Sequence, residues 1–429
     1  EETVIPKPKQ LTEEGRQAAL AFLQSDDLLQ KTNDLIGQSG VIGEEINRLI
    51  MYIVFTSRKR DQPLHCISLG SSGTGKTHLQ EKVGQLIPDE DRIEITTLSE
   101  NAFYYFGQRE LKHKLVLIED LDGAENVLYP MREPLSKRRI SKTIAQKNNK
   151  GETKTINLVV EGPVSVAGCT TKESIYEDNA NRSFLLYLDE SVAQDKKIMQ
   201  YQRLHSAGKV DTDKEQQIRT LLQNCQRVLQ PIKVINPYAE CLTIPTGVLK
   251  PRRTNAHYLA FIEAITFYHQ YEREQLVDKE TGEVYIETML GDVNAANALL
   301  KESLLRKSDE LNGACRNYLE RLKEYLQATN KQTYNTHEIR MKLRIASTTY
   351  RRYQTDLLNA GYIKIRSGKK ATGYQYEIVS YEEYEALQQS IYSVLDNNLK
   401  NLATNPPVRH RENDSPKAKK TSNKGKEPP

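Results

Sequence analysis

The sequence predicts an α/β fold built on a parallel β-sheet, and three observations lead to that prediction. Short apolar runs alternate with helical stretches between residues 61 and 190, which is typical of a parallel sheet covered by helices. A glycine-rich loop, residues 70–77, joins the first apolar run to a helix. The third run, Leu115–Ile118, ends in the acidic pair Glu119 and Asp120. These observations place an α/β core at residues 61–190.

The elements follow in order along the chain. Residues 1–60 are predicted to be a linker and then helices, because apolar residues between Leu11 and Arg58 recur at helical spacing. The five predicted strands of the core are Leu64–Leu69, Ile93–Thr96, Leu115–Ile118, Val164–Cys169 and Phe184–Leu188. Residues 140–160 predict a β-hairpin, since two extended runs flank a tip that contains Asn and Gly.

The second half of the chain predicts three further regions. Residues 191–326 read as a helical lid and connecting helices. Residues 327–400 contain two short helices, Thr336–Leu343 and Ala346–Leu358, followed by two strands around a glycine-containing turn. That order is the winged-helix form of helix-turn-helix. Residues 401–429 are rich in Pro, Lys, Asn and Ser, and predict a disordered basic tail.

Length and composition exclude several classes of protein. The chain has 429 residues, 38% of them hydrophobic, which suggests two or three globular domains. Its longest apolar run is far shorter than the roughly 20 residues of a membrane span, and its start is too polar for a signal peptide. Five scattered cysteines predict a reduced, cytoplasmic protein. Because the chain starts at Glu1 rather than Met, we expect a longer parent protein.

Charge alone does not predict a nucleic-acid-binding protein. The net charge is +4, and it belongs entirely to residues 401–429, so that the rest of the chain is neutral. Binding to nucleic acid must therefore come from local clusters of Lys and Arg.

The loop at residues 70–77 matches the pattern G-x-x-x-x-G-K-[ST] in full. Its residues are Gly70, Ser71, Ser72, Gly73, Thr74, Gly75, Lys76 and Thr77. The glycines let the backbone curl so that N–H groups point at phosphate oxygens, and the following helix N-terminus favours the negative charge. Lys76 is placed to reach the β- and γ-phosphates, and the Thr77 hydroxyl to bind Mg²⁺. The expected cofactors are ATP and Mg²⁺.

The acidic pair at the end of the third strand predicts the remaining metal and water contacts. In P-loop NTPases a carboxylate at this position holds Mg²⁺, and its neighbour can orient and deprotonate the attacking water. By position we assign Glu119 to the metal and Asp120 to the water. The usual order is Asp then Glu. Because the order is reversed here, the sequence leaves open which of the two residues binds the metal and which orients the water.

With these motifs the chain resembles AAA+ ATPases, and within them the MCM-like helicase branch, which has a hairpin before the fourth strand and a winged helix at the end. Two stretches, 68–82 and 118–123, are also similar to the helicase half of primase–helicase proteins of bacterial mobile elements. The resemblance spans about residues 11–380 and is strongest over 64–190.

The resemblance implies further site residues. Thr170 stands where a polar sensor contacts the γ-phosphate or the water, although Asn is more common there. Arg182 stands where an arginine finger enters the neighbouring subunit's site, and a solvent-exposed Arg in a polar loop is the alternative. Arg252 and Arg253 open a helix where a second sensor arginine is expected, and the sequence does not choose between them. A positioned Arg stabilises the charge that spreads over the γ-phosphoryl oxygens. A finger acting in trans requires a ring or stack of subunits.

Two clusters are candidates for DNA contact. The resemblance implies that the hairpin projects into a ring channel, where Lys147 and Lys150 at its tip would contact phosphates; a merely solvated hairpin is the alternative. In the predicted winged helix, the second helix carries Arg351 and Arg352, and the wing tip carries Lys369 and Lys370. Winged helices also dock proteins, so both uses stay open.

The sequence thus predicts an ATP-dependent DNA helicase that acts as a hexameric ring on single-stranded or forked DNA in replication, with a primase module or primase partner and no membrane association. A replication initiator or helicase loader that assembles on DNA without unwinding it is the second hypothesis. A monomeric P-loop kinase or small-molecule enzyme is the third.

Overall fold

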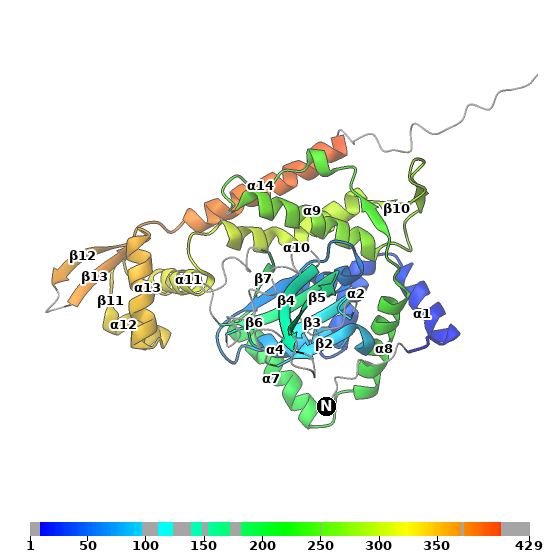
Figure 1. Cartoon of the computed structure of the whole chain (residues 1–429). Helices are drawn as coiled ribbons and strands as arrows, with labels where there is room; N and C mark the ends of the chain where they lie inside the picture. Colours follow the sequence, from blue (N-terminus) through cyan, green and yellow to red (C-terminus); the bar gives the residue numbers. More distant parts are fainter. Residues whose placement is uncertain are drawn as a thin grey trace, which may run out of the picture.

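The computed structural model describes residues 9–96, 110–122, 139–147, 153–171, 182–248, 250–369 and 373–404. Its centre is a five-stranded parallel sheet in the order β2-β3-β6-β1-β7, so the predicted α/β fold with a parallel sheet is confirmed (Figure 1). The strands are β1 (Cys66–Leu69), β2 (Arg92–Ile95), β3 (Lys114–Ile118), β6 (Val164–Thr170) and β7 (Phe184–Tyr187). Their bounds differ from the predicted ones by one or two residues.

Alternation of apolar side chains along the strands builds a core on each face of this sheet. On β3, Leu115 and Leu117 join the main core, which also contains the apolar faces of the surrounding helices. Val116 and Ile118 point to the other face and pack in a smaller cluster. Because every β3 residue from Leu115 to Ile118 is buried, the sheet is covered on both sides, as parallel sheets require.

Helices flank the sheet and form a layer above it (Figure 1). The N-terminal part contributes α1 (Glu13–Leu23), α2 (Leu28–Gln38), α3 (Glu45–Thr56) and α4 (Lys76–Gly84), and the chain after β7 contributes α7 (Val192–Ser206) and α8 (Thr212–Val228). The layer consists of α9 (Pro251–Tyr268), α10 (Leu290–Ser308) and α14 (Glu383–Thr404). None of the described helices is long and apolar enough to cross a lipid bilayer.

Between α8 and α10 the sequence predicted a mostly helical segment, but the structure also contains a small sheet there. Its strands, in the order β8-β10-β9, are β8 (Lys233–Ile235), β9 (Leu276–Val277) and β10 (Val284–Glu287). These strands are two to four residues long, too short to show a period of two in the sequence. The polar loop expected at residues 278–283 connects β9 to β10.

The predicted hairpin is present as β4 (Arg139–Lys147) and β5 (Thr153–Glu161), paired in register from Arg139–Glu161 to Lys147–Thr153. It forms a two-stranded sheet of its own, separate from the central one. The tip, residues 148–152, lies outside the described residues.

A smaller lobe follows α10 and has its own core. Its elements are α11 (Gly313–Ala328), β11 (Tyr334–Asn335), α12 (Thr336–Leu343), α13 (Ser347–Asn359), β12 (Ile363–Lys369) and β13 (Gly373–Ile378). The three strands form a sheet in the order β11-β13-β12. The chain then returns through α14, whose Ile391, Leu395 and Leu402 belong to the main core. The tail predicted to be disordered lies outside the described residues from position 405 onward.

Candidate functional site

The P-loop lies where the sequence predicts it, between the end of β1 and the start of α4. Gly73 and Gly75 have φ angles of 84° and 91°, a left-handed conformation that L residues with a Cβ adopt only at a cost. A Cβ built on either glycine meets no heavy atom within 4 Å, so the loop is open on that side. Lys76 is the first residue of α4, so the helix N-terminus faces this opening and favours an anion there.

The side chain of Lys76 folds back over the loop. It is 8% exposed, and its Nζ donates hydrogen bonds to the backbone oxygens of Gly70 at 2.8 Å and Ser71 at 2.6 Å. The Thr74 hydroxyl also donates to the Ser71 oxygen, at 3.0 Å. These contacts are local, and a phosphate group would offer Lys76 a charged acceptor in place of two neutral ones.

Glu190 is a site residue that the sequence prediction missed. Its carboxylate accepts hydrogen bonds from the Ser71 backbone N at 2.9 Å and from the Ser71 hydroxyl at 3.4 Å. A carboxylate therefore already holds one of the amides of the phosphate-binding loop. The available signal was its place just after β7, because parallel strands end at the same edge of the sheet.

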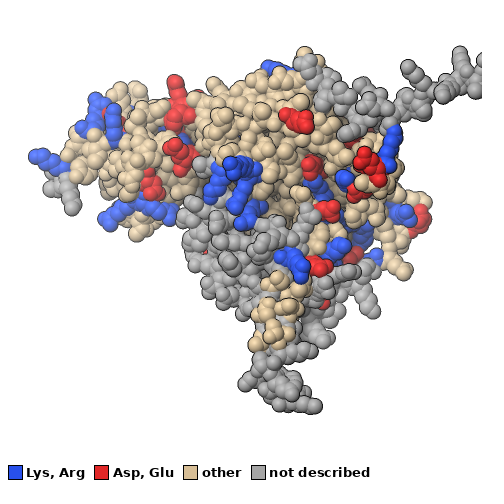
Figure 2. Space-filling view, turned by 45° about the horizontal axis from the view of Figure 1, so that its top comes forward, with Lys and Arg blue, Asp and Glu red and all other residues tan. Residues whose placement is uncertain are grey.

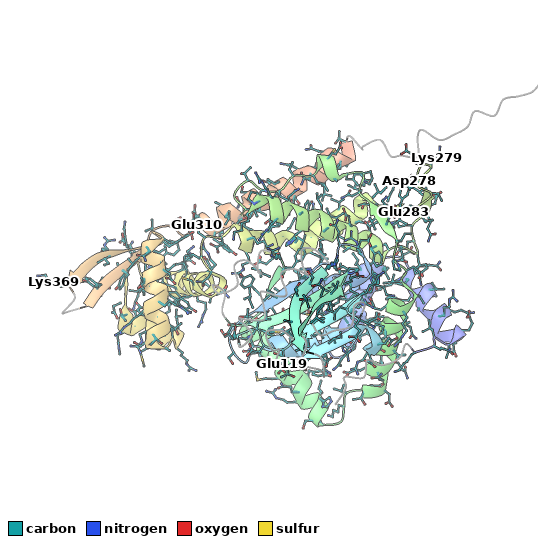
Figure 3. All side chains as sticks on the ribbon, viewed as in Figure 1. Glu119, Asp278, Lys279, Glu283, Glu310 and Lys369 are labelled. Carbon is teal, nitrogen blue, oxygen red and sulfur yellow. The ribbon has the colours of Figure 1, made fainter. Side chains whose placement is uncertain are left out.

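The acidic pair lies at the same edge. The register places Ile118 beside Gly168, and Ser68 and Leu69 beside Cys169 and Thr170. Glu119 and Asp120 directly follow Ile118, and the Leu121 backbone N donates to the Cys169 oxygen at 2.9 Å. Neighbouring strands are about 4.8 Å apart, so Thr170 stands between the base of the P-loop and Asp120. Both acids are exposed, and Figure 3 shows Glu119 at this end of the sheet.

Asp122 is a second residue that the prediction missed. It accepts a short hydrogen bond from the hydroxyl of the sensor candidate Thr170, and another from the Thr171 backbone N at 3.0 Å. Its own backbone N donates to Asp120 Oδ1 at 2.7 Å. Asp122 thus connects the water-orienting candidate to the sensor candidate. Its position two residues after the acidic pair was the only signal.

Cys169, one residue before Thr170, lies close to both the P-loop and the acidic pair. Burial raises the pKa of its thiol to about 12, while a hydrogen bond with Thr77 and the charge of Lys76 act in the opposite direction. Asp120 also acts on this thiol, so the P-loop and the acidic pair share one neighbourhood. Gln80 of α4 donates to the Ile118 oxygen at 3.0 Å and fixes the helix to the end of β3.

The residues present fit a nucleotide with Mg²⁺. The loop offers open backbone N–H groups beside an ammonium, which suits a polyphosphate. Thr77 and Glu119 supply a hydroxyl and a carboxylate, the oxygen ligands that Mg²⁺ prefers. When bound, Mg²⁺ would neutralise charge on the phosphate oxygens.

The predicted arginines lie away from the P-loop. Arg182 is half-buried and comes two residues before Phe184, which starts β7 beside Cys66, the first residue of β1. The P-loop follows the other end of β1, about 10 Å further along the strand. Arg252 and Arg253 are exposed in the first turn of α9.

The charge of Arg253 acts on His257, whose ring lies 5.5 Å from that of Phe184. Arg253 therefore lies on the Arg182 side of the sheet. The structure separates the predicted site residues into two groups, one at each end of the strands.

Of the DNA-contact candidates, Lys147 ends β4, while Lys150 and Lys370 lie outside the described residues. Arg351 and Arg352 are exposed on α13, and Lys369 is exposed at the end of β12. Figure 2 shows several Lys and Arg side chains on this lobe. Lys364 and Arg366 share Glu377, at 2.8 and 2.6 Å.

A family model described as "MTBMA_p00010 P-loop domain" matches residues 13–230. No curated protein sequence matches the chain. Among solved structures, a full-length MCM homolog from Methanopyrus kandleri is similar, with a TM-score of 0.45 and 10% identity over 71% of this chain and 64% of that one. The chain thus corresponds to less than two thirds of that homolog's length. The structure of Drosophila ORC bound to DNA is similar with a TM-score of 0.24 and 11% identity, over 92% and 95%. Both similarities are too distant to bear on function.

Proposed function

Because the chain belongs to the MTBMA_p00010 P-loop domain family and carries its P-loop and its candidate arginines at opposite ends of one sheet, we propose that it is an ATP-dependent DNA helicase. It would be of the MCM-like AAA+ type and work as a hexameric ring with ATP between subunits. The P-loop itself implies nucleotide binding; the DNA, the ring and the unwinding are the proposal.

One observation carries it: the nucleotide groups and the arginines lie at opposite ends of the same strands. Arg182 precedes β7, whereas the P-loop follows β1 at the far end. The side chain of Arg182 is too short to reach the P-loop of its own subunit, because the four-residue strand β7 lies between them. In a ring of identical subunits joined head to tail, the arginine end of one subunit meets the P-loop end of the next. This arrangement supports a finger that acts in trans.

Each residue of the site has its own role in the proposed ATP hydrolysis. Lys76 and the loop amides would hold the phosphates, and Thr77 with Glu119 would hold Mg²⁺. Asp120 orients and deprotonates the attacking water. Thr170 contacts the γ-phosphate or the water, and Arg182 with Arg252 or Arg253 of the neighbour stabilises the charge on the γ-phosphoryl oxygens. Loss of that phosphate then moves the hairpin, where Lys147 and Lys150 hold the DNA backbone.

Strand displacement on a forked duplex tests the proposal. Lys76→Ala and Arg182→Ala proteins should hydrolyse ATP at least about 100-fold more slowly and unwind nothing. Unwinding by the Lys76→Ala protein would refute the motor. A native mass measurement accompanies the assay, because a monomer whose ATPase rate ignores added DNA would indicate a P-loop kinase or small-molecule enzyme instead.

A replication initiator or helicase loader is the second candidate, and the exposed Arg351 and Arg352 on the lobe favour it. Such a protein would assemble on DNA through the lobe and recruit another factor without moving along the strand. Removing the charge of Lys147 and Lys150 should stop unwinding by a motor. It should leave assembly of a loader on DNA intact, as measured by footprinting.

The proposed setting is the replication of a mobile element, together with a primase module or primase partner. It rests on the similarity of residues 68–82 and 118–123 to primase–helicase proteins. Primer synthesis on a forked template, with and without this protein, tests the partnership.

A further inference from the structure

A groove runs along the open edge of the central sheet, where β7 is the last strand. It has a volume of about 810 Å³, and its walls are the start of α3, the second half of α10 and part of α11. Phe184 and Leu188 donate their backbone N–H groups toward β1. Leu185 alternates with them and lines the groove, so its backbone groups point to the open edge. The groove therefore has room for an extended segment beside the last strand of the sheet.

Acidic side chains dominate this groove. Seven of the residues that line it are Asp or Glu, and two, Arg306 and Arg321, are basic. Arg306 donates to Glu302 at 3.0 Å, so one of the two bases is already paired. Burial raises the pKa of Glu44 at the start of α3, because its charge is poorly solvated there. A cationic segment in the groove would balance the excess of carboxylates.

The chain carries a segment of the opposite charge shortly after α14, which ends at Thr404. We call residues 415–426 the lysine segment. It contains no acidic residue and five basic ones, which are Lys417, Lys419, Lys420, Lys424 and Lys426. The lysine segment lies outside the described residues, and its charge is complementary to that of the groove.

The position of α14 lets the lysine segment reach the groove of its own subunit. Asp396 of α14 pairs with Lys301 of α10 at 3.0 Å, and Lys301 precedes Glu302, which lines the groove. From Asp396, α14 continues to Thr404, a distance of about 12 Å along the helix. Residues 405–414 can span about 33 Å when extended, which is enough to pass around α10.

We propose that the lysine segment docks in this groove, through ion pairs between its lysines and the glutamates of α10 and α11. Glu302 of α10, and Glu320 and Glu324 of α11, line the groove. One exposed ion pair contributes little by itself. Several pairs on a tethered segment act together, because the tether keeps the local concentration of the lysines high. The contact is electrostatic and is weakened by salt. It needs neither DNA nor a ring of subunits.

Carbodiimide cross-linking of the full chain tests the contact, because this zero-length reagent joins a carboxylate only to an amine beside it. At about 10 mM salt, where charges are little screened, mass spectrometry should find the lysine segment linked to Glu302, Glu320 or Glu324 of the same copy. The links should disappear at about 1 M salt. Glu280 and Glu310 are exposed acids outside the groove and serve as the control. Links to Glu280 and Glu310 that are equally frequent, or links only between two copies, would overturn the proposal.

Trypsin cleavage of the lysine segment is the second test. Glu302→Gln together with Glu324→Gln removes two charges of the groove and should speed this cleavage by about three- to tenfold, since the segment loses ion pairs that protect it. Glu280→Gln together with Glu310→Gln removes the same charge outside the groove, and should leave the wild-type rate. Equal cleavage of the two double variants would reject docking. If thermal unfolding shows that the groove variant is less stable than its control, the cross-links in the wild-type protein decide.

Discussion

At the scale of single residues, Glu190 occupies a backbone amide that a bound phosphate needs. Its carboxylate holds the Ser71 N–H and hydroxyl, so it competes with another anion for the same donors. Glu190→Gln keeps the shape and removes the charge. We expect it to bind ATP about three- to tenfold more tightly, as a titration with a fluorescent ATP analogue would measure.

The neighbouring Asp189→Asn is the control for Glu190, since Asp189 accepts from Ser191 N at 2.8 Å rather than from the loop. Weaker ATP binding by Glu190→Gln would contradict competition and would make Glu190 a positive contributor to the nucleotide site.

A second prediction at this scale concerns Asp122, which holds the Thr170 hydroxyl and the Thr171 backbone N. Asp122→Ala should lower kcat by about 10- to 100-fold while KM for ATP changes little, because the sensor loses its orientation and not its binding contacts. Thr170→Ser, which keeps the hydroxyl, should retain most of the rate, and Thr170→Val should not. A Thr170→Val protein that is as active as Thr170→Ser would show that the hydroxyl is not needed.

At the scale of elements, β6 approaches the loop after β3 so closely that it requires a glycine. A Cβ on Gly168 would lie 2.7 Å from Leu121 Cδ1. Gly168→Ala should therefore lower the free energy of unfolding by about 1–3 kcal/mol and also slow ATP hydrolysis, because Leu121 lies between Asp120 and Asp122. Urea unfolding and steady-state ATPase assays measure the two effects.

Gly291 offers a matched comparison on α10, since a Cβ there meets nothing within 4 Å. Gly291→Ala should be neutral or raise the free energy of unfolding by up to about 1 kcal/mol, as Ala does in a helix. A Gly168→Ala protein as stable and as active as Gly291→Ala would contradict the close approach.

The same elements show what the sequence could predict. The central sheet could be predicted from its apolar runs and from the P-loop. Strands such as β3 are buried on both faces, so their sequences are continuous apolar runs. The small β8-β10-β9 sheet left no such pattern, since β9 has two residues. Glu190 and Asp122 were missed for another reason: each contacts a partner at least 48 residues away in the chain. No local pattern encodes such a contact.

At the scale of the whole molecule, a buried ion cluster lies where the lobe meets the main body. Asp309, just after α10, pairs with Arg316 of α11 at 2.7 Å, and Arg316 also pairs with Glu383 at the start of α14 at 2.9 Å. Both chain connections of the lobe therefore meet at Arg316. In the proposed helicase, whose lobe would contact DNA, this joint would transmit force from the ATPase core.

Asp309→Asn tests the joint, because it leaves the buried Arg316 without its closest counter-charge. Arg316 keeps Glu383 and Glu320 as partners, so the loss of this charged contact should cost about 1.5–3 kcal/mol. Urea unfolding should shift to lower concentration, and limited proteolysis should cut near residues 308–312. Glu310→Gln is the control: Glu310 is adjacent and exposed, and Figure 3 shows it beside the joint. If Asp309→Asn unwinds DNA and resists protease as Glu310→Gln does, the cluster does not hold the lobe. If it keeps its ATPase rate but loses unwinding, force passes through Arg316.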